Sequence, residues 1–137
     1  MKLVTFAVVL AAALTSTAAC APRPTGLDQI ELQRVRAGNV DVVLLSNDGV
    51  LTHGEDSVTI EFRRGDTLVD VGEVKAAATM PMAGMPPMQG SVFLERSSVP
   101  GRYTAQTDLS MSGGWQLRLD WEGPAGPGTA SFSAIAE

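Results

Sequence analysis

Methionine is concentrated in one short segment of this 137-residue chain. Four of its six methionines fall within residues 79–89, TMPMAGMPPMQ, at Met80, Met82, Met85 and Met88. A thioether is a soft, neutral ligand that selects Cu(I), and it has no proton to lose near neutral pH. The interleaved prolines lack an N–H and fix φ, which predicts an extended, stiff loop instead of a helix or an interior strand. With a bend at Gly84, these spacings could bring three sulfur atoms to one ion, with Met80, Met82 and Met85 as the main ligands and Met88 as an accessory one.

Two further residues are weaker candidate ligands. Met111 precedes the Trp115 strand in a predicted turn, and His53, the only histidine, lies in a predicted loop. The histidine could join the methionines only if the fold brings both loops to the same end. Methionine is also a flexible filler of hydrophobic gaps and an adaptable contact residue. The residues alone therefore leave three interpretations: Cu(I) binding, packing as a hydrophobic lid, and contact with a partner protein.

Catalysis and nucleic-acid binding lack the residues they need. Nucleophilic catalysis commonly requires a histidine or an activated cysteine beside the nucleophile, and this chain has one His and one Cys. No glycine-rich phosphate loop or zinc-ligand spacing is present. The formal net charge is −5 and no basic run occurs, so the electrostatic footprint of a nucleic-acid binder is missing. We expect a protein that is not an enzyme.

The first 19 residues have the layout of an export signal. A positive start at Lys2 precedes an apolar run too short to span a membrane, and small residues lead to the single cysteine, Cys20. This arrangement resembles a bacterial lipobox and predicts lipidation of Cys20; plain cleavage after Ala19 or Ala21 is the alternative. Residues 20–37 would then form the lipidated end, a tether and a lead-in segment, and the mature chain would carry a net charge of −6. We expect a lipid-anchored protein of the cell envelope, on the outer membrane in a two-membrane bacterium.

The remaining residues, 38–137, are predicted to form one domain of short strands. Apolar and polar residues alternate with period two in several runs, and Gly, Pro, Asn and Asp separate these runs. Seven strands are expected, at residues 39–46, 57–64, 68–79, 91–96, 102–109, 115–121 and 129–136. Residues 27–36 have a mixed pattern that leaves helix and strand open. The spacing is typical of an all-β, immunoglobulin-like antiparallel sandwich without the antibody cysteine pair.

Three motifs occur in the order seen in the YtkA-like domain family, which is related to FixH-like envelope proteins. They are residues 58–62 followed by Gly65, MPMAGMPPM at 80–88, and GRY at 101–103 leading into DLSMSGGW at 108–115. The resemblance covers residues 38–121. It implies an immunoglobulin-like sandwich, export to the envelope and a role in handling copper or other heavy metals. Many such sequences carry a histidine soon after the Met-Pro core. None follows Met88 here, so the resemblance leaves a thioether-only site.

Overall fold

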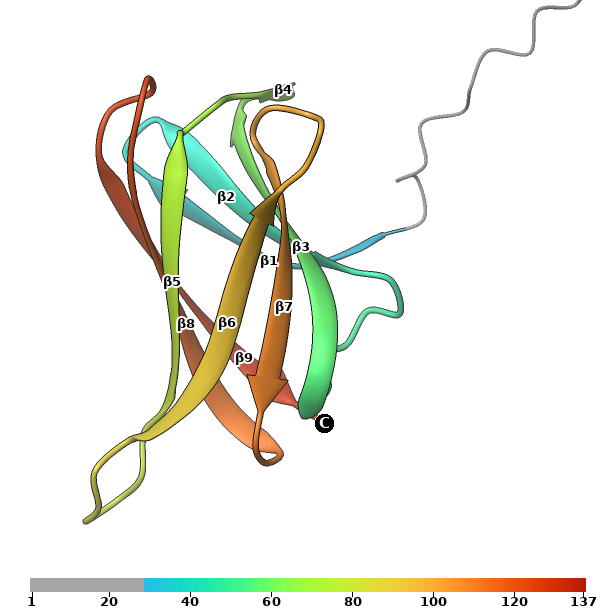
Figure 1. The fold of residues 1–137 in the computed structure, drawn as a ribbon, viewed down its shortest axis with the longest axis vertical. Coiled ribbons are helices and arrows are strands. Elements are labelled where there is room, and N and C mark those ends of the chain that lie inside the picture. Colours follow the sequence, from blue (N-terminus) through green and yellow to red (C-terminus); the bar gives the residue numbers. More distant parts are fainter. Residues whose placement is uncertain (1–28) are drawn as a thin grey trace, which may run out of the picture.

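The computed structural model describes residues 29–137, and this part of the chain contains nine β-strands and no helix. The predicted all-β, immunoglobulin-like antiparallel sandwich is confirmed, with nine strands in place of about seven (Figure 1). The predicted signal peptide and the predicted lipidation site, Cys20, lie outside the described residues. The strands are β1 (Ile30–Ala37), β2 (Val40–Ser46), β3 (Gly54–Arg64), β4 (Thr67–Leu68), β5 (Glu73–Met80), β6 (Met88–Arg96), β7 (Arg102–Leu109), β8 (Gly113–Glu122) and β9 (Gly128–Ala136).

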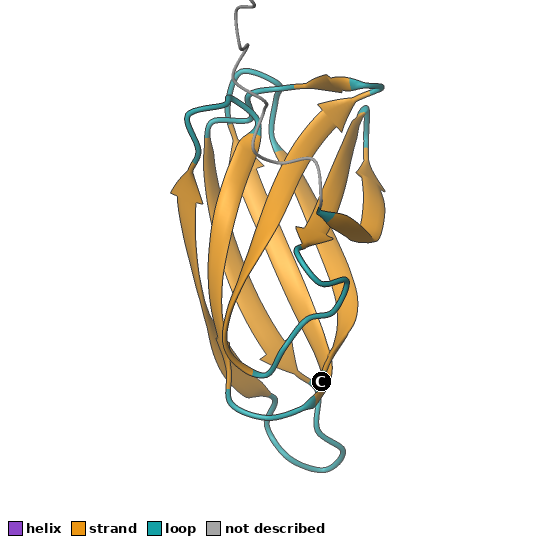
Figure 2. Cartoon of the chain, turned by 90° about the vertical axis from the view of Figure 1, so that its right-hand side faces the viewer, coloured by secondary structure: helices purple, strands orange, loops and turns teal. Residues whose placement is uncertain are grey.

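Two antiparallel layers are joined by one strand, β6. The order along the hydrogen-bonded path is β1-β2-β3-β7-β6-β5-β8-β9, with the short β4 paired to β3. Strand β6 pairs with β5 only over Met88–Gly90 and with β7 over Ser91–Arg96. It therefore passes from one layer to the other at Gly90. The layers face each other in the rotated view (Figure 2).

Gly90 permits this crossover because it has no side chain. A Cβ at this position would lie 2.8 Å from a methyl carbon of Leu109, 2.9 Å from the Trp115 ring and 3.3 Å from Cβ of Ala78. Contacts below 3.0 Å force neighbouring atoms to move, so a larger residue would push the two layers apart at this point.

The core follows the alternation of the sequence. On β8 the residues Trp115, Leu117, Leu119 and Trp121 are buried, while Gln116 and Arg118 between them are exposed. The ring of Phe62 meets Tyr103 and Trp121 edge to face, with centroid distances of 5.4 and 5.0 Å. Aromatic side chains bury the largest apolar areas of any residue type, so these rings supply much of the core's hydrophobic stabilisation.

Tyr103 also ties the two layers together at the end of the sandwich opposite the β5–β6 hairpin. Its hydroxyl donates a hydrogen bond to the Gly72 carbonyl, just before β5 begins. The arrangement is similar to the tyrosine corner of immunoglobulin-like sandwiches. Gly101, directly before β7, lies so close to Val69 that a Cβ there would approach the Val69 carbonyl oxygen to 2.5 Å.

Some strand predictions need correction. The ambiguous segment at 27–36 is strand β1 from Ile30 onward, and its mixed pattern reflects a register shift between Glu31 and Gln33. The single strand expected at 68–79 is broken, because residues 69–72 connect β4 to β5. Strand β3 begins at Gly54, so Glu55 and Asp56 belong to a strand and only His53 remains in the loop.

Glu61 shows that β3 is covered on both faces, whereas its alternation predicts one solvent-facing side. This carboxylate is 1% exposed and accepts hydrogen bonds from Arg63 and Arg102 on either side. A buried charge is tolerated only when it is paired, and here two guanidinium groups provide the pairing.

Candidate functional site

The methionine segment forms the loop between β5 and β6. Met80 is the last residue of β5 and Met88 the first of β6, and the two are direct partners across the ladder. Pro81 has no N–H to continue the pairing, so the strands separate there. Residues 81–87 form the loop, which projects beyond one end of the sandwich as the yellow segment in Figure 1. The predicted Met-Pro loop is therefore confirmed, but it is flanked by two strand methionines.

Met80 points into the end of the sandwich. Its side chain is 8% exposed and belongs to the hydrophobic core. The methyl group lies over Gly113 at the start of β8, where a Cβ would be 2.7 Å from Met80 Cε. Gly113 thus makes room for the Met80 thioether, and its φ of 134° is also one that favours glycine.

Met88 reaches the same corner of the molecule from the neighbouring strand. It is half-buried, and the Ser110 hydroxyl lies 3.0 Å from its sulfur atom, as a donor to the thioether. Ser110 opens the turn of residues 110–112 between β7 and β8, directly before Gly113. Directly opposite residues on antiparallel strands have Cβ atoms about 4.5–5.5 Å apart. Two thioethers therefore converge on one turn; we call this pair, Met80 and Met88, the thioether pair.

The other methionines differ in their surroundings. Met82 is half-buried against the core, and its carbonyl accepts a hydrogen bond of 3.3 Å from the Met85 N–H. Met85 lies at the tip of the loop with 58% of its surface exposed. Met111 is 41% exposed, and its carbonyl accepts the Trp115 indole N–H at 3.0 Å. Met82 is two residues from Met80, and Met111 lies in the turn between Ser110 and Gly113, whereas Met85 is exposed at the tip of the loop.

His53 lies at the same end of the sandwich as the methionine loop. Gly54, the next residue, pairs with Leu109 at the end of β7. The imidazole is exposed, with Nδ1 2.6 Å from the Glu137 carbonyl oxygen. When Nδ1 donates that hydrogen bond, the lone pair of Nε2 faces away from it and is free to bind a ligand. The backbone N–H of His53 also donates to the Glu137 carbonyl, directly after β9, and within residues 29–137 no hydrogen bond joins His53 to the hairpin.

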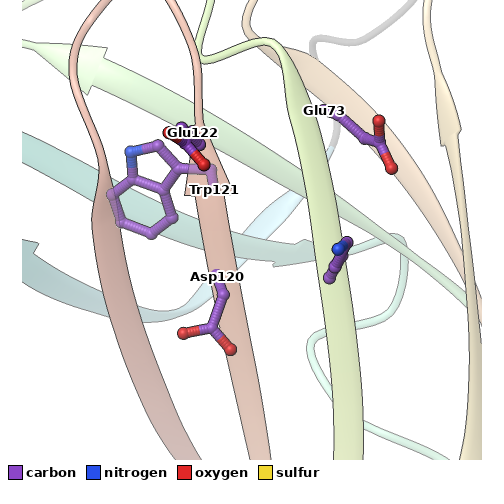
Figure 3. A pocket seen from close by; sticks show the side chains of 5 residues that line it. Glu73, Asp120, Trp121 and Glu122 are labelled. Carbon is purple, nitrogen blue, oxygen red and sulfur yellow. The ribbon is translucent and has the colours of Figure 1, made fainter.

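Carboxylates gather elsewhere, on the outer face of β5 and β8. Glu73 comes from β5 and Asp120 and Glu122 from β8, around a shallow pocket of about 310 Å³ (Figure 3). Lys75 also lines this pocket, and Asp120 pairs with Arg118 at 3.0 Å. The Arg118 hydrogen bonds lower the pKa of Asp120 below its ordinary value. Within residues 29–137, no three His, Cys, Asp or Glu side chains are grouped to hold a metal ion.

Thioether sulfur atoms such as those of Met80 and Met88 are the kind of neutral donor that soft cations select. Both sulfur atoms are shielded by the sandwich on one side, and neither titrates near neutral pH, so the pair remains available over a wide pH range. Ser110 and Gly113 were not singled out from the sequence, although they lie in the DLSMSGGW motif. Their roles depend on which strands become neighbours, and spacing along the chain does not show that.

The described part of the chain contains no helix long and apolar enough to cross a membrane. A family model described as YtkA-like matches residues 34–120, which include the hairpin, the thioether pair and the turn before β8. Comparisons with curated proteins and with solved structures returned no match.

Proposed function

This chain belongs to the YtkA-like family, and on that premise we propose that it is a non-catalytic, lipid-anchored protein of the cell envelope that binds a soft metal ion. The ion is Cu(I), or Ag(I), which shares its softness, and the principal ligands are the sulfur atoms of Met80 and Met88. The protein would capture the ion or pass it on in copper handling.

One observation carries the proposal: Met80 and Met88 are cross-strand partners whose side chains meet the same turn. Met80 lies over Gly113 and Met88 contacts Ser110, three residues earlier in the chain. Two thioethers on paired strands are pre-positioned, so binding requires little ordering of the backbone. A third sulfur could come from Met82 in the loop or Met111 in the turn, since both flank the pair.

The anchoring part of the proposal rests on the sequence of the first 20 residues. An apolar leader ending in small residues and a lone cysteine is the support for lipidation at Cys20. Metabolic labelling with a radioactive fatty acid tests it. The wild-type protein should incorporate label and the Cys20→Ser variant should not; an unlabelled wild type would favour plain cleavage.

A competitive Cu(I) titration tests the metal site. The protein competes with a chromogenic Cu(I) chelator, and we compare wild type, Met80→Leu/Met88→Leu and Met85→Leu. Leucine preserves apolar volume at little cost in stability but removes the sulfur donor. The double variant should lose Cu(I) binding, and Met85→Leu should retain it. Equal affinity of the wild type and the double variant would refute the thioether pair as the site.

A second candidate function is an interaction module without a metal. The exposure of Met85 and Met111, 58% and 41%, favours this alternative, because flexible thioether side chains adapt to a partner surface. Met→Leu changes keep the apolar contact, so partner binding should survive the substitutions that abolish metal binding. Binding of a partner to both Met→Leu variants, combined with no Cu(I) affinity in the wild type, would establish this function instead.

A further inference from the structure

Phe93 departs from the pattern of the other described phenylalanines. Phe62 and Phe132 are completely buried, whereas Phe93 on β6 is 64% exposed. The alternation of β6 places it on the solvent side of the sheet. Its partner on β7 is Gln106, which in turn pairs with Ser57 on β3, and this row of polar neighbours leaves the ring uncovered.

The ring lies in an open groove of about 550 Å³ along the outer face of β3, β7 and β6. Three carboxylates and no Lys or Arg are among its lining residues, which are Glu55, Asp56, Ser57, Ser91, Phe93, Gln106, Thr107 and Asp108. Glu55 and Asp108 are direct cross-strand partners. Like charges placed opposite each other destabilise a sheet, so this pair favours an incoming cation.

These carboxylates differ from those of the pocket on β5 and β8. In that pocket Lys75 lies among the acidic groups and Arg118 pairs with Asp120. Glu55 and Asp108 make no ion pair with any residue in 29–137, although the Asp56 carboxylate accepts backbone N–H groups of Thr52 and Ser57. Negative charge that is not compensated within the described structure therefore coincides with an exposed aromatic ring.

We propose that this groove docks a basic, extended segment of a partner protein. An Arg or Lys side chain of that segment lies over the Phe93 ring, and the adjacent residues of the segment lie near Glu55 and Asp108. A cation above an aromatic face gains from the ring quadrupole, and the flanking carboxylates add charge complementarity and orientation. The groove adjoins the thioether pair: Asp108 lies two residues before Ser110, and Ser91 three after Met88. A docked partner would lie beside the methionines, but the docking proposal does not depend on metal binding.

The test uses hexa-arginine as the probe and hexaglutamate as its negative control. Backbone amide shifts of the isotope-labelled protein report the binding surface during titration at low salt. Hexa-arginine should shift the amides of Ser57, Phe93 and Gln106 most strongly, and hexaglutamate should shift none. Replacement Phe93→Ser should weaken binding about two- to fivefold, the factor expected for an exposed cation–π contact. Unchanged affinity in this variant would contradict the proposal.

A pair of charge-matched variants separates the groove from the overall negative charge. Glu55→Gln/Asp108→Asn and Glu73→Gln/Glu122→Gln each remove two carboxylates from the chain. The first should weaken hexa-arginine binding about threefold or more, because it removes charges that contact the peptide, and the second should change it less. Equal weakening, or shifts spread over both faces, would show attraction to net charge alone and overturn the proposed site. Cu(I) affinity should remain unchanged in both variants, so this result is independent of the metal proposal.

Discussion

Met80 and Met85 carry the same functional group in opposite surroundings. Met80 is 8% exposed against β8, and Met85 is 58% exposed at the tip of the loop. From the sequence, Met80, Met82 and Met85 were the main candidate ligands and Met88 an accessory one. We propose Met80 with Met88 instead, because these two residues are direct partners in the β5–β6 ladder, which spacing along the chain does not reveal.

Tyr103, the only tyrosine, predicts how stability responds to alkaline pH. Burial raises the pKa of its hydroxyl above the ordinary value of 10.0. The folded state therefore holds this proton more tightly than the unfolded state does. The stability that the protonated Tyr103 hydroxyl contributes is fully present below pH 10 and is lost as pH rises through the folded-state pKa.

Replacement Tyr103→Phe tests both effects of the hydroxyl, its hydrogen bond to Gly72 and its pH-dependent contribution to stability. At neutral pH the variant loses the hydrogen bond to Gly72, and its free energy of unfolding should fall by about 1 kcal/mol. Above pH 10 the difference between variant and wild type should shrink. Urea unfolding at pH 7, 9 and 11 measures both; a difference that stays constant or widens with pH would contradict this role.

At the scale of elements, the crossover of β6 depends on Gly90. The Gly90→Ala variant should lose about 1–3 kcal/mol of unfolding free energy, because its Cβ would lie 2.8–2.9 Å from Leu109 and Trp115. Gly114→Ala is the matched control, since a Cβ there meets nothing within 4 Å. Chemical denaturation compares them. Similar unfolding free energies for the two variants would mean that the close packing at Gly90 does not restrict the size of the residue at this position.

The loop of residues 81–87 can be separated from the strands that carry the thioether pair. Because Met80 and Met88 are direct partners, an Asn-Gly turn can replace the whole loop, as in a two-residue hairpin. A shorter loop costs less closure entropy, so stability should be retained or increased. The shortened protein keeps the pair but lacks Met82 and Met85, and it should still bind Cu(I) in the chelator competition. Complete loss of binding would assign the site to the loop methionines.

Much of this fold could be predicted from alternation and turn residues. Strands β7 and β8 could be located to within two residues at each end, since one face of each is buried and, apart from Thr107, apolar or aromatic. Strand β1 was ambiguous because its register shift after Glu31 breaks the alternation. The burial of Glu61 was missed for a different reason: its arginine partners include Arg102, which is 41 residues away in the chain.

At the scale of the whole molecule, the Phe62–Tyr103–Trp121 cluster and the proposed metal-binding methionines lie at opposite ends of the sandwich. The aromatic cluster and the Tyr103 hydrogen bond close one end, while Met80, Met88 and the turn before β8 form the other. The acidic groove begins at this second end and follows the outer face of β6 and β7. The cluster of Phe62, Tyr103 and Trp121 therefore lies away from both proposed binding features, whereas Met80 is itself part of the hydrophobic core.

Methionine methyl groups give the most direct test of the thioether pair. Ag(I) is titrated into protein labelled with ¹³C at the methionine methyls, and each resonance is assigned from a Met→Leu variant. The Met80 and Met88 signals should shift together and saturate at one ion per chain, while Met85 changes little. If the Met85 signal shifts first, or if Met80 and Met88 do not respond, the two strand methionines do not form the metal site.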